Sequence, residues 1–279
     1  MATVIMTDST SDITAEHIKE LGVYVLPVIV NFGEKSYRDT VDINTRQFFD
    51  MLRESDVNPT TSQPTPRDFL AVFEQFRQKG DEVVYIGVSS ALSGTLQSAR
   101  IAADMSGYDK IYIVDSLSAT LGLEILVRYA CKLRDMGKNG AQVARAVEEK
   151  VPKGRLIAVV DTLKYLMRGG RISKAVGVIG GALGIKPLVS VVDGKVDGIG
   201  KARGQKNAFD KLCEMLKSAD IDKDMPCIVA NADDVDNMRV FEKFLRENGI
   251  DLQWTNSEVG SVVGTHVGPG CVGIAYFEK

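Results

Sequence analysis

Short β-branched runs alternate along the first half of the chain with longer segments whose apolar residues recur three and four positions apart. The short runs predict strands over residues 3–9, 23–32, 82–89 and 110–116. The longer segments predict amphipathic helices over residues 14–22, 44–55, 65–80, 95–107 and 121–137. Strands that alternate with helices in this way favour a mostly parallel sheet with helices on its faces.

The pattern changes near residue 152, where we place a domain boundary. Two β runs flank an Asp193-Gly194 pair, which is typical of a hairpin turn. Later runs predict strands over residues 227–232, 251–259 and 272–277. The sequence therefore predicts a two-domain α/β protein, with a mostly parallel sheet in residues 1–152 and a mixed sheet in residues 153–279.

Composition and charge narrow the class of protein. Of the 279 residues, 44% are hydrophobic and 25% charged, which is typical of a folded globular chain. The net charge of −3 gives no sign of a nucleic-acid partner. The four cysteines are widely spaced, so we expect small buried side chains and neither a zinc site nor a disulfide framework. The sequence shows no signal-peptide pattern and no apolar run of about 18 residues, so we expect a cytoplasmic protein.

Three predicted strands end in turns rich in hydroxyl groups. The turns cover Asp8–Asp12, Val88–Thr95 and Asp115–Thr120. Because the ends of parallel strands meet at one edge of a sheet, we expect the three turns to lie together where ligands bind. The helix that begins at Thr95 offers N–H groups to an anion, and Gly94 allows the backbone a close approach. The alternative is that these hydroxyls only cap helices.

Two further polar segments are candidates for ligand contact. Asn58–Pro66 is predicted to be a rigid loop with Thr61 among its polar side chains, or simply a connection that caps the next helix. Val263–Gly270 is predicted to be a glycine-rich loop around His266, which either contacts a ligand or is an ordinary surface histidine. The other histidine, His17, lies among charged residues of a predicted helix, and we expect it to be solvated.

Catalytic and nucleotide-binding motifs are weak. Ser93 or Ser89 with His266 would make a nucleophile and a base, but no GxSxG turn and no evident acid partner accompany them. Gly198–Gly204 has GxGxxxG spacing and follows a hairpin, unlike a dinucleotide loop, and no GxxxxGK[ST] segment occurs. A serine-dependent hydrolase or acyltransferase, and a binder of another small anion, remain as alternatives.

Basic residues gather in one part of the chain. Between Lys164 and Lys206 there are nine basic residues and two acidic ones, a net charge of +7 in a chain that is acidic overall. This favours an acidic partner surface, phosphate groups or an anionic membrane, unless the charges are scattered and solvated. Within this segment, Ala175–Val192 is apolar and rich in glycine, and it predicts either a core helix and strand or a wall beside an apolar ligand.

Eight motifs occur in the order TDSTSD, TTSQP, ALSGTLQSA, VDS, YLMRGGRIS, IKPLVSVVDGKV, KARGQK and THVGPG. As a set, from Asp8 to Gly270, they resemble the DegV family of bacterial fatty-acid-binding proteins. The resemblance implies two α/β domains with an acyl chain buried between them, and the bound fatty acid as ligand with no other cofactor.

The resemblance also implies a role as the binding subunit, FakB, of bacterial fatty acid kinase. Such a protein is not an enzyme alone: it presents a long-chain fatty acid to a separate, dihydroxyacetone-kinase-like subunit that uses ATP. The acyl phosphate that forms feeds phospholipid synthesis. The implied partners are the fatty acid, that kinase subunit and, briefly, an anionic membrane surface, with no nucleic acid.

Site residues follow from the matched motifs. The carboxylate-binding positions of the family correspond to Thr61, Ser62, Ser93, Gly94, Thr95 and His266. Arg171 and Arg203 match basic positions associated with the head-group region and kinase docking. Three residues depart from the family pattern: Thr40 and Glu124, where glycine or a small residue is usual, and Leu96, where tyrosine is frequent.

Overall fold

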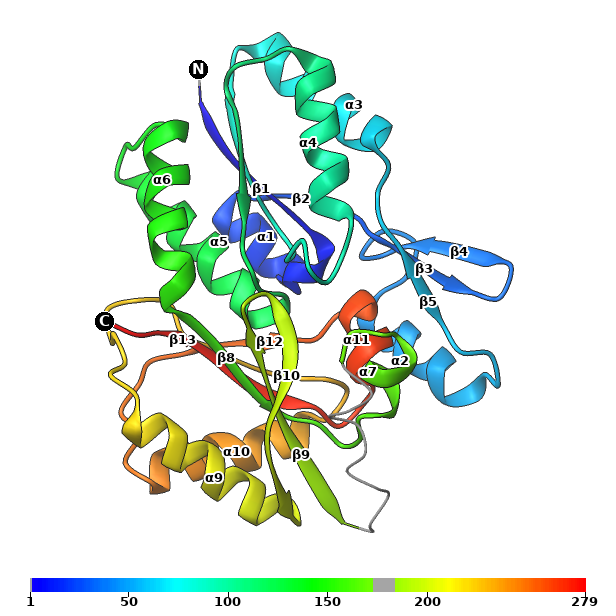
Figure 1. Cartoon of the computed structure of the whole chain (residues 1–279), viewed down its shortest axis with the longest axis vertical. Helices are drawn as coiled ribbons and strands as arrows, with labels where there is room; N and C mark the ends of the chain where they lie inside the picture. Colours follow the sequence, from blue (N-terminus) through cyan, green and yellow to red (C-terminus); the bar gives the residue numbers. More distant parts are fainter. Residues whose placement is uncertain (1, 173–183) are drawn as a thin grey trace.

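The computed structural model describes residues 2–172 and 184–279, and these form three β-sheets with helices packed around them (Figure 1). An N-terminal sheet lies in the upper half of the view, a C-terminal sheet in the lower half, and a small sheet projects to one side (Figure 1). The predicted α/β fold class, with a parallel N-terminal sheet and a mixed C-terminal sheet, is confirmed.

The N-terminal sheet is parallel throughout. Its strand order is β2 (Tyr24–Leu26), β1 (Thr3–Asp8), β6 (Glu82–Gly87) and β7 (Ile111–Asp115). Helices connect these strands because parallel neighbours need a crossover. Helices α1 (Ala15–Leu21), α3 (Pro66–Lys79) and α4 (Thr95–Ser106) lie between strands of this sheet in the chain, whereas α5 (Thr120–Asp135) and α6 (Gly140–Lys150) follow its last strand. The cores place α3 and α4 on one face of the sheet and α5 and α6 on the other.

Helix α5 joins the two larger sheets. It packs against β1 and β6 of the N-terminal sheet and also against β8, β11 and β13 of the C-terminal sheet. Its buried residues include Leu121, Leu123, Leu126 and Cys131, which lie on different sides of the helix. A helix that is apolar all round is buried between layers, so the sequence of α5 already fits its central position.

The C-terminal sheet is mixed. Its strand order is β10 (Lys195–Arg203), β9 (Ile185–Val192), β8 (Gly154–Val159), β13 (Val272–Phe277), β11 (Ile228–Asn231) and β12 (Thr255–Glu258). Only β11 and β12 pair in parallel among these described strands, and β9 and β10 form the predicted hairpin. Helices α9 (Gln205–Ser218) and α10 (Val235–Glu247) form an apolar core with the sheet.

The prediction of one strand over residues 23–32 is wrong. The chain turns at Pro27, which has no N–H for a ladder, and β2 and β3 (Ile29–Phe32) belong to different sheets. The small sheet has the order β4 (Lys35–Arg38), β3, β5 (Thr60–Ser62). The predicted loop 58–66 therefore contains a short strand, which places Thr61 opposite Val30.

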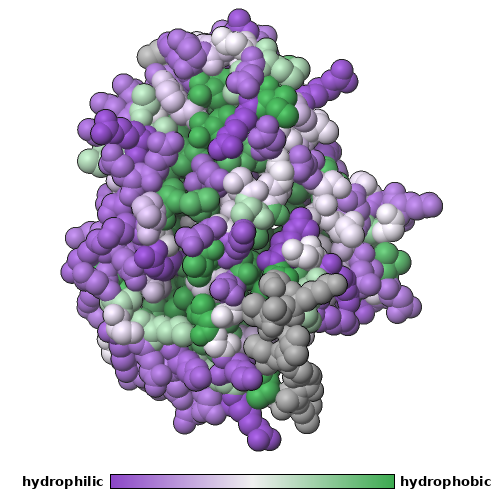
Figure 2. Space-filling model, viewed as in Figure 1, coloured by the Kyte–Doolittle hydropathy of each residue, from purple (hydrophilic) through white to green (hydrophobic). Residues whose placement is uncertain are grey.

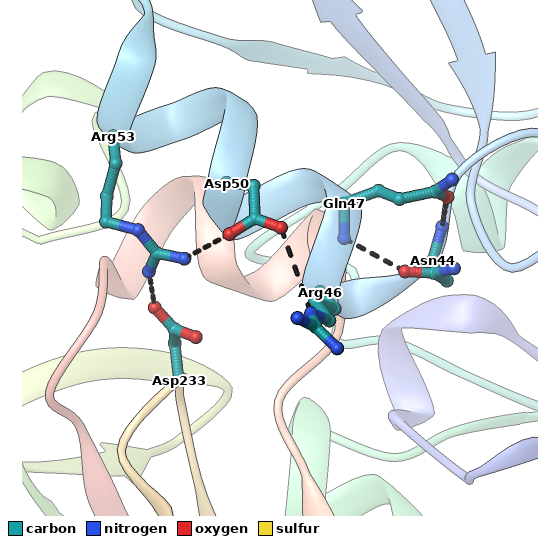
Figure 3. Close-up of polar contacts among 6 residues, drawn as sticks. All are labelled: Asn44, Arg46, Gln47, Asp50, Arg53 and Asp233. Carbon is teal, nitrogen blue, oxygen red and sulfur yellow. Dashed lines mark hydrogen bonds and ion pairs between the residues drawn. The ribbon is translucent and has the colours of Figure 1, made fainter.

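The segment that contains the small sheet and the helix between β4 and β5 packs against the C-terminal half of the chain. Helix α2 (Thr45–Glu54) begins with a capping box between Asn44 and Gln47, and near its end Arg53 pairs with Asp233 (Figure 3). One core cluster combines Val30 and Phe48 from this segment with Val160 from the far side of residue 152. The short helices α7 (Lys164–Arg168) and α11 (Ser261–Val267) contribute to the same cluster.

Among the described helices longer than one or two turns, α6, α9 and α10 were not predicted from the sequence, and neither was the short helix α7. Each of the three longer helices is rich in charged residues and buries a narrow apolar stripe, such as Met238, Phe241 and Leu245 of α10.

All four cysteines are free and buried, as expected. In the described part of the chain, no helix is long and apolar enough to cross a membrane. On the face shown in Figure 2, polar side chains cover most of the rim and apolar ones gather along the middle.

Candidate ligand-binding site

A cavity of about 190 Å³ lies between the N-terminal and C-terminal sheets. One wall is the edge of the parallel sheet where β1, β6 and β7 end, and the opposite wall is a face of the C-terminal sheet. Residues of β5 and α11 also line it. The three hydroxyl-rich turns meet at this cavity, because Thr10, Ser93 and Thr120 all line it. The prediction that these turns lie together is therefore confirmed, because β1, β6 and β7 are parallel neighbours whose carboxyl ends share one edge of the sheet.

Most of the cavity wall is apolar. Small residues pair across the C-terminal sheet in one row, Ala230 with Gly273, Gly273 with Ala158, and Ala158 with Val189. All four line the cavity. A Cβ added to Gly273 would lie 2.9 Å from the Cβ of Ala158, so only glycine fits at position 273 in this floor of the cavity. A surface of this kind accommodates an alkyl chain rather than a polar ligand.

Polar groups gather where β5, α4 and α11 approach one another. The Oγ1 atom of Thr61 lies 3.0 Å from Nε2 of His266. The expected loop position of His266 is wrong, because this residue lies in the last turn of helix α11. A Cβ on Gly169 would lie 2.2 Å from Nδ1 of His266, so glycine at that position lets the ring pack against the backbone after α7.

His266 is a neutral imidazole at neutral pH. Burial, and secondarily the positive charge of Arg171, lower its pKa to about 4. A neutral imidazole donates at one nitrogen and accepts at the other. If Nε2 carries the hydrogen, it donates to Thr61, and the Thr61 hydroxyl then keeps its own hydrogen to donate into the cavity.

The start of α4 supplies the second set of donors. Ser93 Oγ lies 2.8 Å from the hydroxyl of Thr95, which is fully buried. Gly94 is the N-cap residue, and a Cβ there would lie 2.1 Å from Oε1 of Gln63. Gln63 lines the cavity and donates to Ser98 at 3.0 Å. Gln63 is one of the polar side chains of the predicted loop 58–66 but is not among the predicted carboxylate-binding residues, although it follows Thr61 by two residues in the TTSQP motif.

Of the other residues predicted for the site, one lines the cavity and two do not. Arg171 lines the cavity, and its Nε donates to the carbonyl of Leu92 at 3.3 Å. Ser62 points to the other face of β5, where its hydroxyl accepts from Asn31. Arg203 ends β10 opposite Ile185 and does not line the cavity. The structure thus brings Thr61, Ser93, Gly94, His266 and Arg171 together, with Thr95 behind Ser93.

The serine–histidine pairs considered for catalysis are not formed. Ser89 Oγ donates to the carbonyl of Gly194 at 2.7 Å, and the hydroxyl of Ser93 bonds to Thr95. The hydrogen-bond partner of His266 is Thr61. Among the described residues, no group of three or more His, Cys, Asp or Glu side chains is arranged to hold a metal ion.

Buried acidic groups lie beside the cavity without lining it. Asp12 and Asp39 both approach Gly260, and burial raises the pKa of each carboxyl, that of Asp39 to about 6. Burial also raises the pKa of Glu124. The ion pair with Arg128, whose Nη2 lies 2.8 Å from Oε1 of Glu124, partly offsets this rise. The expectation that His17 is solvated is wrong: it is partly buried, and burial lowers its pKa.

Some of the cations in the basic segment Lys164–Lys206 have polar partners among the described residues. Lys186 pairs with Asp161, and Arg168 donates to Asn58. Lys174 and residues 175–183 of the apolar glycine-rich segment lie outside the described residues. The rest of that segment, Ile185–Val192, forms strand β9, and Val189 to Val191 line the cavity.

These features define an α/β protein with an apolar cavity between two sheets, and with hydroxyl, imidazole and guanidinium groups at one end of that cavity. The chain belongs to the DegV family: residues 2–279 match the family described as "Uncharacterised protein, DegV family". A DegV domain-containing protein of Caldanaerobacter subterraneus is 38% identical over 99% of this chain and 98% of its own length. A second, from Clostridium acetobutylicum, is 37% identical over 99% and 98% of the two chains.

Solved structures show the same fold. A fatty-acid-binding DegV family protein from Thermus thermophilus is 31% identical, with a TM-score of 0.89 and full coverage of both chains. The fatty acid binding protein DegV of Bacillus subtilis is 28% identical, with a TM-score of 0.85 and full coverage of both chains. A stearic-acid-binding protein from Eubacterium ventriosum is 26% identical, with a TM-score of 0.88, over 100% of this chain and 99% of the other.

Proposed function

We propose that this chain binds one long-chain fatty acid, with the acyl chain in the cavity between the sheets and the carboxylate at Thr61, Ser93 and His266. The observation that carries this proposal is a mostly apolar cavity in which Thr61, Ser93, His266 and Arg171 are gathered in one place. The fatty acids bound by the similar proteins of Thermus thermophilus and Bacillus subtilis support it.

The polar end fits a carboxylate. A buried carboxylate requires several donors, because leaving its charge unpaired in an apolar site is unfavourable. The hydroxyls of Thr61 and Ser93 and the N–H groups at the start of α4 are such donors. The guanidinium of Arg171 adds a positive charge at the same end of the cavity. Ser62 contacts Asn31 instead, so its part in the site would require a different side-chain position.

The proposal includes the role of the protein as the binding subunit of a fatty acid kinase. The chain then presents the carboxylate to a separate ATP-dependent, dihydroxyacetone-kinase-like subunit in the cytoplasm, and the acyl phosphate enters phospholipid synthesis. Arg171 and Arg203 would face that subunit, and the basic segment from Lys164 to Lys206 would briefly contact an anionic membrane during lipid exchange. The chain itself would contribute no catalytic group.

The alternatives are less well supported by the geometry. A hydrolase would need Ser89 or Ser93 bonded to His266, and their hydrogen bonds go elsewhere. A binder of a small anion would need no apolar cavity beyond its donors, whereas most of this cavity is lined by valine, leucine and alanine.

One experiment tests binding and presentation together. Delipidated wild-type protein and the variants Thr61→Val, Arg203→Ala, Thr60→Val and Lys201→Ala are titrated with palmitate, and each is then mixed with the kinase subunit and ATP. We expect Thr61→Val to weaken palmitate binding about tenfold, because it removes one donor to a charged group. We expect Arg203→Ala to bind palmitate normally and to lower acyl phosphate formation about tenfold.

Two matched variants control this experiment. Thr60 is exposed on the same strand as Thr61, and Lys201 is exposed two residues before Arg203 on β10. Both controls should bind palmitate and support phosphorylation as the wild type does. A wild-type protein that does not bind palmitate would overturn the binding role. Normal phosphorylation with Arg203→Ala would overturn only the docking role of Arg203.

A further inference from the structure

A second pocket, of about 400 Å³, adjoins the polar end of the cavity. It shares Leu92 and Arg171 with the cavity, and its other lining residues include Gly170, Ile172 and Lys195. Arg171 therefore borders both the site proposed for the carboxylate and a space immediately outside it. The proposed carboxylate site includes neither this outer pocket nor Lys195.

The position of Lys195 is fixed by the turn of the β9–β10 hairpin. Figure 1 shows this hairpin extending from the lower sheet toward the upper half of the molecule. At its tip, Ser89 Oγ donates to the carbonyl of Gly194 at 2.7 Å. Gly194 is buried with a φ of +77°, and a Cβ there would lie 2.6 Å from Ser89 Oγ. The turn is thus held against the loop after β6, and the next residue is Lys195.

Two positive charges line the outer pocket without an acidic partner in the described part of the chain. The guanidinium of Arg171 donates to the backbone carbonyls of Leu92 and Gly169, which are neutral acceptors. Lys195 has no ion pair among the described residues, unlike Lys186 of the same hairpin, which pairs with Asp161. Two uncompensated cations beside a pocket favour binding of a multiply charged anion.

We propose that the outer pocket is a subsite for a phosphoryl group covalently attached to the bound acyl chain, with Arg171 and Lys195 as its cationic groups. This inference rests on the proposed function. A carboxylate oxygen would form a bond to the γ-phosphorus of a nucleoside triphosphate held by the kinase. The bond from that phosphorus to the β–γ bridging oxygen would break, and its electron pair would leave with the nucleoside diphosphate.

The charge change in this step explains why a second cation is needed. The fatty acid head has one negative charge, whereas the head of the acyl phosphate has two and extends beyond the carboxylate position. Arg171 borders both sites, so it would contact the head before and after transfer. Lys195 lines only the outer pocket, so it would contact the phosphoryl group alone. Lys195 is therefore the residue that should distinguish the two ligands.

Competitive binding to the whole protein tests this subsite. Palmitate and hexadecyl phosphate, a stable lipid phosphate, each displace a fluorescent fatty acid from the wild type and from Lys195→Ala, Lys195→Arg and Lys201→Ala. We expect Lys195→Ala to weaken hexadecyl phosphate about tenfold and palmitate by less than about twofold, since it removes one charge-assisted contact. Lys195→Arg should restore most of the affinity, and Lys201→Ala should change neither ligand.

The outcomes separate the subsite from the function on which it rests. Equal effects of Lys195→Ala on both ligands, or no effect on either, would overturn the subsite and leave fatty acid binding intact. A wild type that binds neither ligand would overturn the proposed function together with the subsite. Inorganic phosphate alone should compete only at millimolar concentration. Tight binding of inorganic phosphate without the chain would identify a free-phosphate site and contradict the proposal.

Discussion

The cavity of this protein is lined mainly by apolar side chains and by a few polar ones. Burial determines the ionisation of the titratable side chains in and beside it. His266 is neutral because it is buried and lies near Arg171. Glu124, a departure from the family pattern, is tolerated in the core because Arg128 pairs with it. Thr40, another departure, has a φ of +65°, a left-handed conformation that glycine adopts without strain, which accounts for the glycine usual at that position.

The ionisation of His266 gives a prediction at this scale. In the ligand-free protein we expect its imidazole to remain neutral down to about pH 4, because burial disfavours the charged form. Since the folded pKa lies below the unfolded value, this histidine lowers stability as the pH falls from about 6.5 to about 4. A bound carboxylate should raise the pKa by stabilising the imidazolium.

Nitrogen NMR of the two histidines measures this directly, and His17→Gln assigns the signals because His17 is the only other histidine. A titration midpoint near 6.5 for His266 in the ligand-free protein would contradict a buried imidazole bonded to Thr61.

Sequence motifs were sufficient to find some of these residues and insufficient for others. Thr61, Ser93 and His266 could be predicted because their motifs match a known family, and the structure brings them to one cavity. Ser62 could not be separated from Thr61 without knowing that they lie in a strand, where neighbouring side chains point to opposite faces. Gln63 was recognised only as one polar side chain of its segment, because an amide in a polar stretch of sequence gives no sign of its contact with α4.

At the scale of elements, helix α11 connects the buried acidic groups to the cavity. The carboxylate of Asp39 faces Ser9 and also Ser261, the first residue of α11, and His266 lies in the last turn of the same helix. Val262 and Val263 between them line the cavity. The packing of α11 therefore depends on a group that titrates, while its other end contacts the proposed carboxylate site.

The pKa of Asp39 predicts a dependence of stability on pH. Burial raises this pKa to about 6, so between about pH 4 and 6 the folded chain holds a proton that the unfolded chain has lost. The contribution of Asp39 to the free energy of unfolding should thus fall as the pH rises through that window, by up to about 3 kcal/mol. Asp39→Asn should remove this dependence in urea unfolding measured from pH 4.5 to 7.5.

Asp42→Asn is the matched control, because Arg38 lowers the pKa of Asp42 to about 2, outside the window. The same slope in wild type and Asp39→Asn would show that the carboxyl of Asp39 is not buried as described.

The elements themselves were predicted where their apolar periodicity was strong. The strands and helices of residues 3–22 and 82–137 were found because buried parallel strands and α5 have continuous apolar runs. The division of residues 23–32 into two strands was missed because β2 and β3 both contain β-branched residues and follow each other closely. The sheet that each strand joins depends on contacts with residues distant in sequence. Helices α9 and α10 were missed although apolar residues recur at helical spacing in both, as Phe209, Leu212 and Leu216 do in α9.

At the scale of the whole molecule, the site exists only because two sheets and a short strand meet. Thr61 comes from the small sheet, Ser93 from the parallel sheet edge, and His266 from the helix before β13. The floor comes from the central strands of the C-terminal sheet, where Ala158, Ala230 and Gly273 are small. No single segment of the sequence predicts that these residues meet at one cavity. The order of the motifs along the whole chain predicted it through the resemblance to a known family.

The central claim, that the cavity holds a fatty acid, is tested most directly by denaturing extraction and mass spectrometry of the protein as purified from cells. We expect about one fatty acid per wild-type chain and much less in the Thr61→Val/Ser93→Ala variant, whose carboxylate donors are reduced while its apolar wall is unchanged. The mass would also identify the chain. A wild-type protein that is purified without a fatty acid, and takes up none when palmitate or oleate is added, would contradict the account.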